Sequence, residues 1–339
     1  MKRQKGESGL RKFFFSVICI LAVMFILLGS SIGCDRLAPI EPPGAGTPEP
    51  PPLPPQLQQT GNEEPTLLVY IAEEGVVREM AFEEYIAGVV AGEMDPTWPR
   101  EVLAAQAIIA RTFTLQKIAE NGGVPERGAH ASTDIEEFQA YSAADITDQV
   151  REAVQMTRGE VAYHNNEFIR GWFSAYAGPR TAEADEGLAF EGGNPPYIQI
   201  VDNPGQDIIP VEEGEWSASF PLEKVRNVVR EATGKDPGPV QRVEVKEFGP
   251  SGRAAVFQVN DLEISGPGLR LGLGSAEMRS TFLKDVNVAE GMLQMSGSGY
   301  GHGVGMCQWG ARALAEQGRS PEEIVRYFYR DINIATVWE

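Results

Sequence analysis

The chain has 339 residues, 42% of them hydrophobic, which suffices for one large domain or two smaller ones with a sizeable core. Its formal net charge of −19 offers nothing that matches a phosphate backbone, so nucleic acid is excluded as the expected partner. Of the three cysteines only Cys307 lies in the body of the chain, so we expect no internal disulfide there.

The first 33 residues have the pattern of a membrane-targeting segment. Residues 1–12 carry five basic residues against one acid and are expected to be cytoplasmic, whereas residues 13–33 carry no charge over roughly the length that spans a bilayer. Two fates remain open: an uncleaved anchor, which we favour, or cleavage before Cys34 as a lipoprotein signal. Either fate predicts a protein tethered to the outer face of the cell membrane, with its domain in the wall space.

Residues 34–65 form a linker dominated by proline, with glycine, glutamine and glutamate between the prolines. We expect an extended spacer, about 28 residues of which would reach some 80–90 Å at ~3.1 Å per residue. A proline motif that binds another protein is the alternative. Either way, residues 66–339 are expected to form the folded domain.

Two helices are predicted at the start of that domain, and Glu93 lies at the corner between them. The apolar positions of the first helix recur at helical spacing: Phe82, Tyr85, Ile86, Val89 and Val90. Glu93 continues this apolar face, and Asp-Pro at 95–96 ends the helix. A second helix is expected from near Pro99 to Asn121.

This position predicts unusual chemistry for Glu93. Partial desolvation disfavours the charged carboxylate and raises its pKa, which is what a general acid at neutral pH requires. The alternative is that Glu93 only caps or salt-bridges the second helix, because structural carboxylates outnumber catalytic ones.

The remaining elements are short strands and helices without strict alternation or an internal repeat. We therefore predict an α+β fold: one extracellular domain of helices and β-hairpins with a docked β-rich subregion. The expected strands are 67–72, 76–80, 160–163, 167–173, 242–248 and 254–259, and the expected helices are 146–157, 220–233, 306–317 and one that opens with a capping box at Ser320.

A glycine-rich stretch near the C-terminus holds further candidates. Glycines occupy alternate positions from 297 to 305, a spacing that fits no phosphate-binding loop but lets the backbone approach a ligand closely. Within it, His302 is a candidate ligand-contacting or orienting donor, or else it makes a structural hydrogen bond. Cys307 is either a thiol nucleophile or a buried thiol.

Several motifs together resemble the family of sporulation stage II protein D and the related amidase-enhancer proteins. They stand in the family's order over nearly all of residues 66–339: EEYIAGVVAGEM, LAAQAIIARTFTL, GEVAYHNNEFIRGWFSAYAGPRT, FGPSGR, LRLGLG, MRSTFL and GYGHGVGMCQWGARALAEQG. The resemblance implies a lytic transglycosylase that cleaves peptidoglycan between N-acetylmuramic acid and N-acetylglucosamine, leaves 1,6-anhydro ends and prefers strands stripped of stem peptides. It places the catalytic glutamate on Glu93, and it suggests a role in wall remodelling during sporulation.

A lytic transglycosylase uses the muramic acid 6-hydroxyl as nucleophile, so one residue can act first as acid and then as base, whereas ordinary glycosidases need two carboxylates. We expect Glu93 to do both, with His302, Gln308, Tyr176 and Arg180 holding the sugars. Some relatives bind zinc near DIEEFQAY through cysteines that are missing here, so no metal and no other cofactor is expected.

Two other functions remain open. One is a non-catalytic wall-binding protein that positions or stimulates a cell-wall amidase, and the change to Ser174–Gly178 from the family's usual substrate loop suits that role as well. The other is a true hydrolase, which would need a second carboxylate near Glu93 from Asp95 or Asp134.

Overall fold

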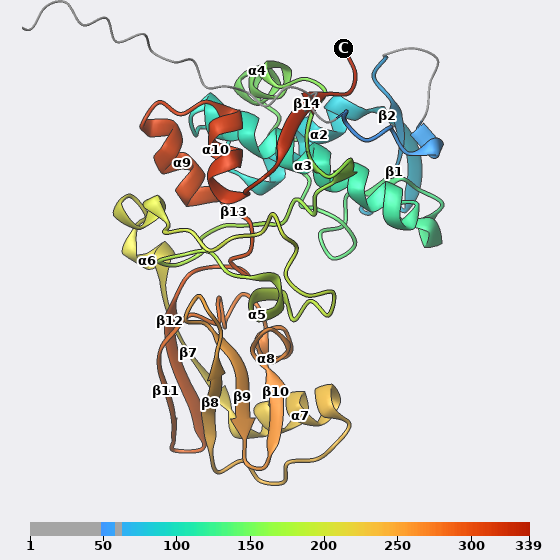
Figure 1. Ribbon diagram of the computed structural model, residues 1–339. Coiled ribbons are helices and arrows are strands. Elements are labelled where there is room, and N and C mark those ends of the chain that lie inside the picture. Colours follow the sequence, from blue (N-terminus) through green and yellow to red (C-terminus); the bar gives the residue numbers. More distant parts are fainter. Residues whose placement is uncertain (1–48, 58–62) are drawn as a thin grey trace, which may run out of the picture. The chain divides into compact units, whose positions relative to one another are not determined.

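The computed structural model describes residues 49–57 and 63–339, which belong to one compact unit, Pro48–Glu339 (Figure 1). Helices and short sheets are mixed along the chain, so the predicted α+β class is confirmed. Among the described residues no helix is long and apolar enough to cross a bilayer. The predicted membrane segment, residues 13–33, lies outside the described residues.

The proline-rich stretch differs from the predicted spacer over its described part. Pro51 and Pro54 are buried, Leu57 is 2% exposed, and a 3₁₀ turn spans Pro55–Leu57. These apolar side chains pack on the main core, and prolines lose little backbone entropy on docking because their φ is already fixed. The compact unit therefore begins before residue 66, the start that the sequence predicted.

The main core surrounds the two helices predicted from the sequence. Helix α2, Phe82–Glu93, ends at Glu93, as expected. Helix α3, Arg100–Asn121, is capped by Gly122, whose left-handed φ of 75° suits glycine. Strands β1, β2 and β3 form one sheet in the order β2-β1-β3, and β14, β4 and β5 form another in the order β14-β4-β5. The elements of this region are β1 Thr66–Ile71, β2 Val76–Ala81, α2 Phe82–Glu93, α3 Arg100–Asn121, β3 Ala131–Ser132, α4 Asp148–Met156, β4 Glu160–His164, β5 Glu167–Phe168, β6 Phe173–Ser174, β13 Met306–Cys307, α9 Gln308–Glu316, α10 Pro321–Phe328 and β14 Asn333–Thr336.

A second core is β-rich and lies between β6 and β13 in the sequence. Two three-stranded antiparallel sheets, β10-β9-β8 and β11-β12-β7, pack with two helices around residues such as Phe220, Phe257 and Leu293 (Figure 1). Its elements are β7 Glu215–Pro221, α7 Leu222–Thr233, β8 Val243–Phe248, β9 Ala254–Val259, β10 Leu262–Ser265, α8 Gly266–Leu273, β11 Leu283–Ala289 and β12 Met292–Ser298, with the short helices α5 Ala184–Leu188 and α6 Val211–Gly214 preceding them.

Local predictions agree with the structure where turn and capping residues set the boundary. Asn165 and Asn166 take positive φ angles of 48° and 63° in the β4–β5 turn, and Ser320 opens α10 with a capping box. Phe220 is an exception, because it belongs to β7 and not to the following helix. Its side chain is 1% exposed in the second core, so packing between strands outweighs its helical spacing.

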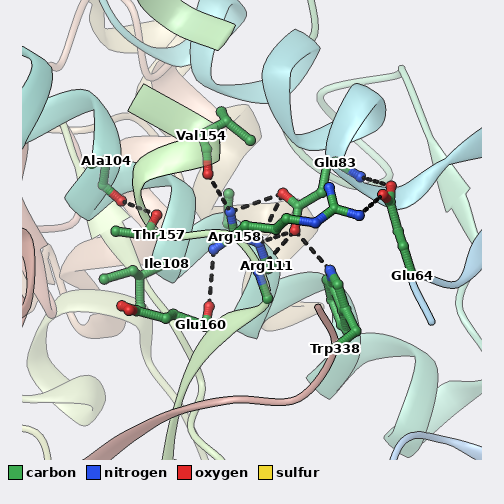
Figure 2. A network of polar contacts seen from close by, with 12 residues as sticks. Glu64, Glu83, Ala104, Ile108, Arg111, Val154, Thr157, Arg158, Glu160 and Trp338 are labelled. Carbon is green, nitrogen blue, oxygen red and sulfur yellow. Dashed lines mark hydrogen bonds and ion pairs between the residues drawn. The ribbon is translucent and has the colours of Figure 1, made fainter. Parts of the chain in front are cut away.

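The N-terminal end of α2 is fixed by a buried ion pair (Figure 2). Arg111 on α3 donates from Nε and Nη2 to the carboxylate of Glu83, at 2.9–3.1 Å. Trp338 donates its indole N–H to the same carboxylate at 2.9 Å, and the backbone N–H of Gly159 donates at 3.0 Å. Glu83 therefore joins α2 and α3 to the C-terminal segment.

Candidate active site

Glu93 is the last residue of α2, and its side chain is half-buried. Its Oε1 accepts a hydrogen bond from the backbone N–H of Ala140, at 2.7 Å. Desolvation raises the pKa of Glu93 from its ordinary value of 4.5 to about 7, and the Ala140 bond opposes that rise only in part. The carboxyl also lies at the negative end of the helix dipole, which disfavours its charged form further.

The loop at residues 138–142 reaches Glu93 because two glycines flatten one face of α2. A Cβ on Gly88 would lie 2.0 Å from the Tyr141 ring, and a Cβ on Gly92 would lie 2.7 Å from the Tyr141 backbone N. The backbone N–H of Ser142 also donates to the Gly88 carbonyl, at 2.9 Å. Gly88 and Gly92, one helical turn apart, thus allow the loop to cover the carboxyl of Glu93.

Helix α9 approaches Glu93 through its first residue, Gln308. The side-chain Nε2 of Gln308 donates to the backbone carbonyl of Glu93, at 3.1 Å, and lies 3.5 Å from Oε1 of Gln106 on α3. Gln308 therefore satisfies a carbonyl that the end of α2 leaves without a helical partner. The structure brings this predicted site residue to the glutamate, and its role in holding a sugar stays a prediction.

Cys307 is the N-cap of α9. Its Sγ accepts hydrogen bonds from the backbone N–H groups of Gly310 and Ala177, each at 3.3 Å, and burial raises the pKa of the thiol. A thiol with a raised pKa forms little thiolate at neutral pH. Of the two alternatives for Cys307, the structure therefore favours the buried thiol.

Two tryptophans and an arginine lie beside the corner that follows Glu93. The rings of Trp98 and Trp309 pack edge to face with centroids 4.8 Å apart, and the Arg312 guanidinium lies 5.0 Å from each centroid. Trp98 belongs to the α2–α3 loop, while Trp309 and Arg312 belong to α9. We call these three residues the tryptophan–arginine stack.

Trp309 also lines a cavity of about 160 Å³. Tyr176 lies in its wall, joined to Tyr300 by two backbone hydrogen bonds of 3.0 and 2.7 Å, and burial raises the pKa of Tyr176 to about 12. Tyr176 therefore stays a neutral hydroxyl at physiological pH. The other polar side chains in the wall are those of Arg279, Glu212 and Glu213.

His302 and Arg180, the other two predicted sugar-binding residues, form no hydrogen bond or ion pair with Glu93 within the described part of the chain. Nδ1 of His302 accepts from the backbone N–H of Val304, at 3.0 Å. Burial, assisted by Arg270 and Arg253, lowers the pKa of His302 to about 3, so the ring is neutral. The structure therefore favours the structural hydrogen bond for His302. Arg180 is exposed, and its backbone carbonyl accepts from the Arg253 guanidinium, at 3.1 Å.

Neither candidate for a second carboxylate is bonded to Glu93. Asp95 Oδ1 accepts from the backbone N–H and the hydroxyl of Thr97, at 2.9 and 2.8 Å, and these bonds lower the pKa of Asp95. Asp134 Oδ1 accepts from the backbone N–H of Glu136, at 3.0 Å. Both acids thus close their own turns, and neither shares a hydrogen bond with Glu93 among the described residues.

The described residues also offer no candidate metal site. Within residues 49–57 and 63–339, no three histidine, cysteine, aspartate or glutamate side chains gather as a metal would require. The expected absence of zinc stays a prediction.

Sequence reasoning missed the tryptophan–arginine stack and the loop amide of Ala140. Trp98 and Trp309 are far apart in the chain, and each stands beside the motif that carries Glu93 or Gln308. A tryptophan next to a candidate catalytic residue was the available signal. A backbone amide leaves no such signal in the sequence.

Comparisons with known proteins identify what the region around Glu93 is similar to. Residues 70–164, which include all of α2 and α3, match the family model described as stage II sporulation protein. The chain is 28% identical over 292 residues to stage II sporulation protein D of Bacillus subtilis, covering 79% of this chain and 78% of that protein. It is 29% identical over 267 residues to an uncharacterized protein of Brachyspira hyodysenteriae, covering 76% and 68% respectively.

A further relative is the amidase enhancer of Bacillus subtilis, 26% identical over 288 residues, which cover 72% of this chain but only 39% of that protein. These matches define a protein with a stage II sporulation domain around the Glu93 corner. Residues 70–164 thus form a domain of the stage II sporulation protein family, and over most of its length the chain is similar to stage II sporulation protein D and to the amidase enhancer, as its motifs predicted.

Proposed function

We propose that the protein is a peptidoglycan lytic transglycosylase, and that Glu93 is its catalytic acid and base. The observation that carries the proposal is the state of Glu93: a desolvated carboxyl at a helix C-terminus, with a pKa of about 7 and one N–H donor. At pH 7 about half of such a carboxyl is protonated, against roughly 0.3% for an unperturbed glutamate. Both the acid and the base form are then available during one turnover.

The proposed reaction needs no second carboxylate. Glu93 donates its proton to the glycosidic oxygen between N-acetylmuramic acid and N-acetylglucosamine as the bond to the muramic C1 breaks. The muramic 6-hydroxyl then attacks C1, and the Glu93 carboxylate takes the hydroxyl proton. The products are a 1,6-anhydro end and a free 4-hydroxyl, and Glu93 returns to its protonated form. Asp95 and Asp134 take no part, since each is held in a local turn.

The surroundings of Glu93 suit a sugar strand. Tryptophan and tyrosine faces bind the apolar faces of sugar rings. Trp98, in the loop that follows Glu93, packs on Trp309, and Trp309 lines a cavity together with Tyr176. Gln308 holds the end of α2, so it positions Glu93. Tethering to the outer face of the membrane through residues 13–33 and action on the wall during sporulation belong to the same proposal.

The proposal is tested with the full-length chain and Glu93→Gln in detergent, each incubated with peptide-stripped glycan strands. Glutamine keeps the acceptor for the Ala140 N–H but cannot donate a proton to the leaving oxygen. We expect the variant to lose at least about a hundredfold in rate. Mass spectrometry should find anhydro-ended fragments, which are lighter than hydrolytic products by one water. Hydrolytic ends would point instead to a hydrolase with a second acid.

A second candidate function rests on the name of one relative, the amidase enhancer. In that case the protein binds the wall and stimulates an amidase without cleaving glycan. This function would be favoured over a lytic transglycosylase if wild type and Glu93→Gln stimulate an amidase equally and neither releases glycan fragments.

A further inference from the structure

Residues 51–57 contact the main core through every third side chain, and we call them the proline segment. The buried side chains are those of Pro51, Pro54 and Leu57, and the exposed ones are those of Pro52, Pro55 and Gln56. The backbone N–H of Leu57 donates to the carbonyl of Pro54, at 2.8 Å, and closes a 3₁₀ turn. Polyproline and 3₁₀ helices both have three residues per turn, so one face recurs at every third position. The proline segment therefore has the burial pattern of a bound ligand with one face against its receptor.

A groove formed by the last turns of α3, by β5 and by Tyr197 receives the start of the proline segment. Pro51 and Pro52 line a cavity of about 410 Å³ there, together with Phe168 and Tyr197. Both aromatic side chains are 9% exposed, and the hydroxyl of Tyr197 accepts from the backbone N–H of Arg170, at 2.9 Å. Aromatic-lined grooves bind proline-rich peptides because such peptides are already extended and lose little entropy on docking. We call this surface the proline groove.

A second attachment follows at Glu64, shortly before β1. Oε2 of Glu64 pairs with Nη2 of Arg158, at 2.6 Å, and its Oε1 accepts from the backbone N–H of Glu83, at 2.7 Å (Figure 2). The Arg158 and Glu64 side chains are 28% and 17% exposed, so this ion pair is partly shielded from water. The chain is thus fixed to the main core at the proline segment and again at Glu64, and these parts of it do not act as a free spacer.

We propose that the proline groove is a recognition site for proline-rich peptide, that its ligand is the proline segment of the same chain, and that this docking sets the length of the tether. A ligand joined to its own site has an effective concentration in the millimolar range, so a groove of modest affinity stays occupied. Prolines add to this because their φ is fixed before docking. The tether length rests on the membrane segment of the proposed function, whereas recognition by the groove does not.

Docking shortens the distance over which the domain can work. The sequence predicts a spacer of about 28 residues from Ala38, with a reach of some 80–90 Å. Only about 13 of those residues precede Pro51, and as a polyproline helix they reach roughly 40 Å. The docked proline segment therefore holds the domain within about half of the distance from the membrane that a free spacer allows.

The first test measures how fast thermolysin, which cleaves before leucine, cuts the Gln56–Leu57 bond in the full-length chain. Each rate is divided by the rate for a free peptide of the same sequence. Wild type should be protected at least about tenfold, because cleavage requires the proline segment to leave the groove. Pro54→Ser, which removes a buried ring, should lose most of that protection. Pro55→Ser is the matched control at the adjacent exposed proline and should keep it. Wild type cleaved as fast as its peptide, or equal protection in both variants, would overturn the docking.

The second test asks whether the groove recognises the peptide in trans. A fluorescent peptide of residues 49–57 should bind full-length Pro54→Ser at least about tenfold more tightly than Pro55→Ser or wild type, because only in Pro54→Ser has the internal competitor been weakened. Equal binding to all three would overturn recognition by the groove.

The tether length has its own readout, the largest dimension of the full-length chain in lipid nanodiscs, measured by X-ray scattering. Release of seven residues should increase it by up to about 20 Å in Pro54→Ser and leave Pro55→Ser unchanged. No increase in Pro54→Ser would overturn the role of docking in setting the tether. None of these measurements uses glycan cleavage, so their failure is distinct from failure of the proposed transglycosylase.

Discussion

Helix α2 carries a glutamate near each end, and the two have opposite surroundings. Glu83, in the first turn, receives hydrogen bonds from the Arg111 guanidinium, the Trp338 indole and the Gly159 backbone (Figure 2). Glu93, in the last turn, receives one, from the Ala140 backbone. The positive end of the helix dipole favours a charge at Glu83, and the negative end opposes one at Glu93.

This contrast separates a structural carboxylate from the proposed catalytic one on the same helix. Glu83 is compensated by a cation and two neutral donors, so its charge contributes to holding three segments together. Glu93 lacks a cation partner among the described residues, and its pKa rises to about 7. Ion pairing, the alternative that the sequence left open for Glu93, is what Glu83 does ten residues earlier.

The largest effect on stability is expected from removing Arg111, the cation that pairs with Glu83. Arg111→Met leaves a buried carboxylate with two neutral donors, and we expect the free energy of unfolding to fall by about 3–5 kcal/mol. Arg151→Met is the control, because it removes an exposed partner of the adjacent Glu84 and should cost about 1 kcal/mol or less. Urea unfolding measures both. Equal losses would contradict the contrast between buried and exposed pairs.

The proposed role of Glu93 as proton donor predicts how the rate depends on pH. The proton donor must be protonated, so kcat/KM on stripped strands should fall tenfold per pH unit above about 7, or roughly a hundredfold by about pH 9. The profile of the free enzyme reports this pKa directly. If kcat/KM instead begins to fall near pH 4.5, the ordinary pKa of glutamate, desolvation does not set the pKa of the proton donor.

The same pKa makes Glu93 a cost to stability above neutral pH. Because the folded pKa of about 7 exceeds the unfolded value of 4.5, the folded state binds the proton more tightly, and stability falls as pH rises between these values. Glu93→Gln removes this dependence. The difference in unfolding free energy between Glu93→Gln and wild type should therefore shift in favour of the variant as the pH rises. We expect a shift on the order of 2 kcal/mol from about pH 4 to about pH 8. A constant difference across that range would argue against a raised pKa.

The smallest effect concerns the glycines that admit the loop. Gly92→Ala gains about 1 kcal/mol of helix propensity, but its Cβ would lie 2.7 Å from the Tyr141 backbone, so overpacking of roughly 1–3 kcal/mol offsets the gain. We expect little net change in melting temperature. A displaced Ala140 amide should lower kcat/KM by about tenfold. Unchanged activity would show that the loop does not position the carboxyl.

A matched pair sharpens this last prediction at the neighbouring glycine. Gly88→Ala places its Cβ against the Tyr141 ring, at 2.0 Å, and should also lower activity. Adding Tyr141→Ala removes the obstructing ring, so the double variant should recover part of the lost activity. If the double variant recovers no activity, the loss caused by Gly88→Ala arises from a change in α2 and not from the clash with the Tyr141 ring.

Periodicity and turn chemistry predicted much of the fold around the site. The apolar spacing from Phe82 to Val90 set the buried face of α2, and Asp-Pro at 95–96 set its end. These features act within one or two helical turns, so they are visible in the sequence. The same local reasoning assigned Phe220 to a helix, which is wrong because a cross-strand core outweighs propensity there.

The sequence by itself determined that Glu93 lies on an apolar helix face at a corner, and that the chain has the motifs of its family. Only the tertiary structure decided which groups meet Glu93: the Ala140 amide, Gln308 from a helix more than 200 residues later, and the stack of Trp98, Trp309 and Arg312. It also placed the ring of His302 where it accepts a hydrogen bond from the backbone N–H of Val304. The physical reason is that a pKa depends on burial and partners in space, which chain spacing specifies only within a helical turn.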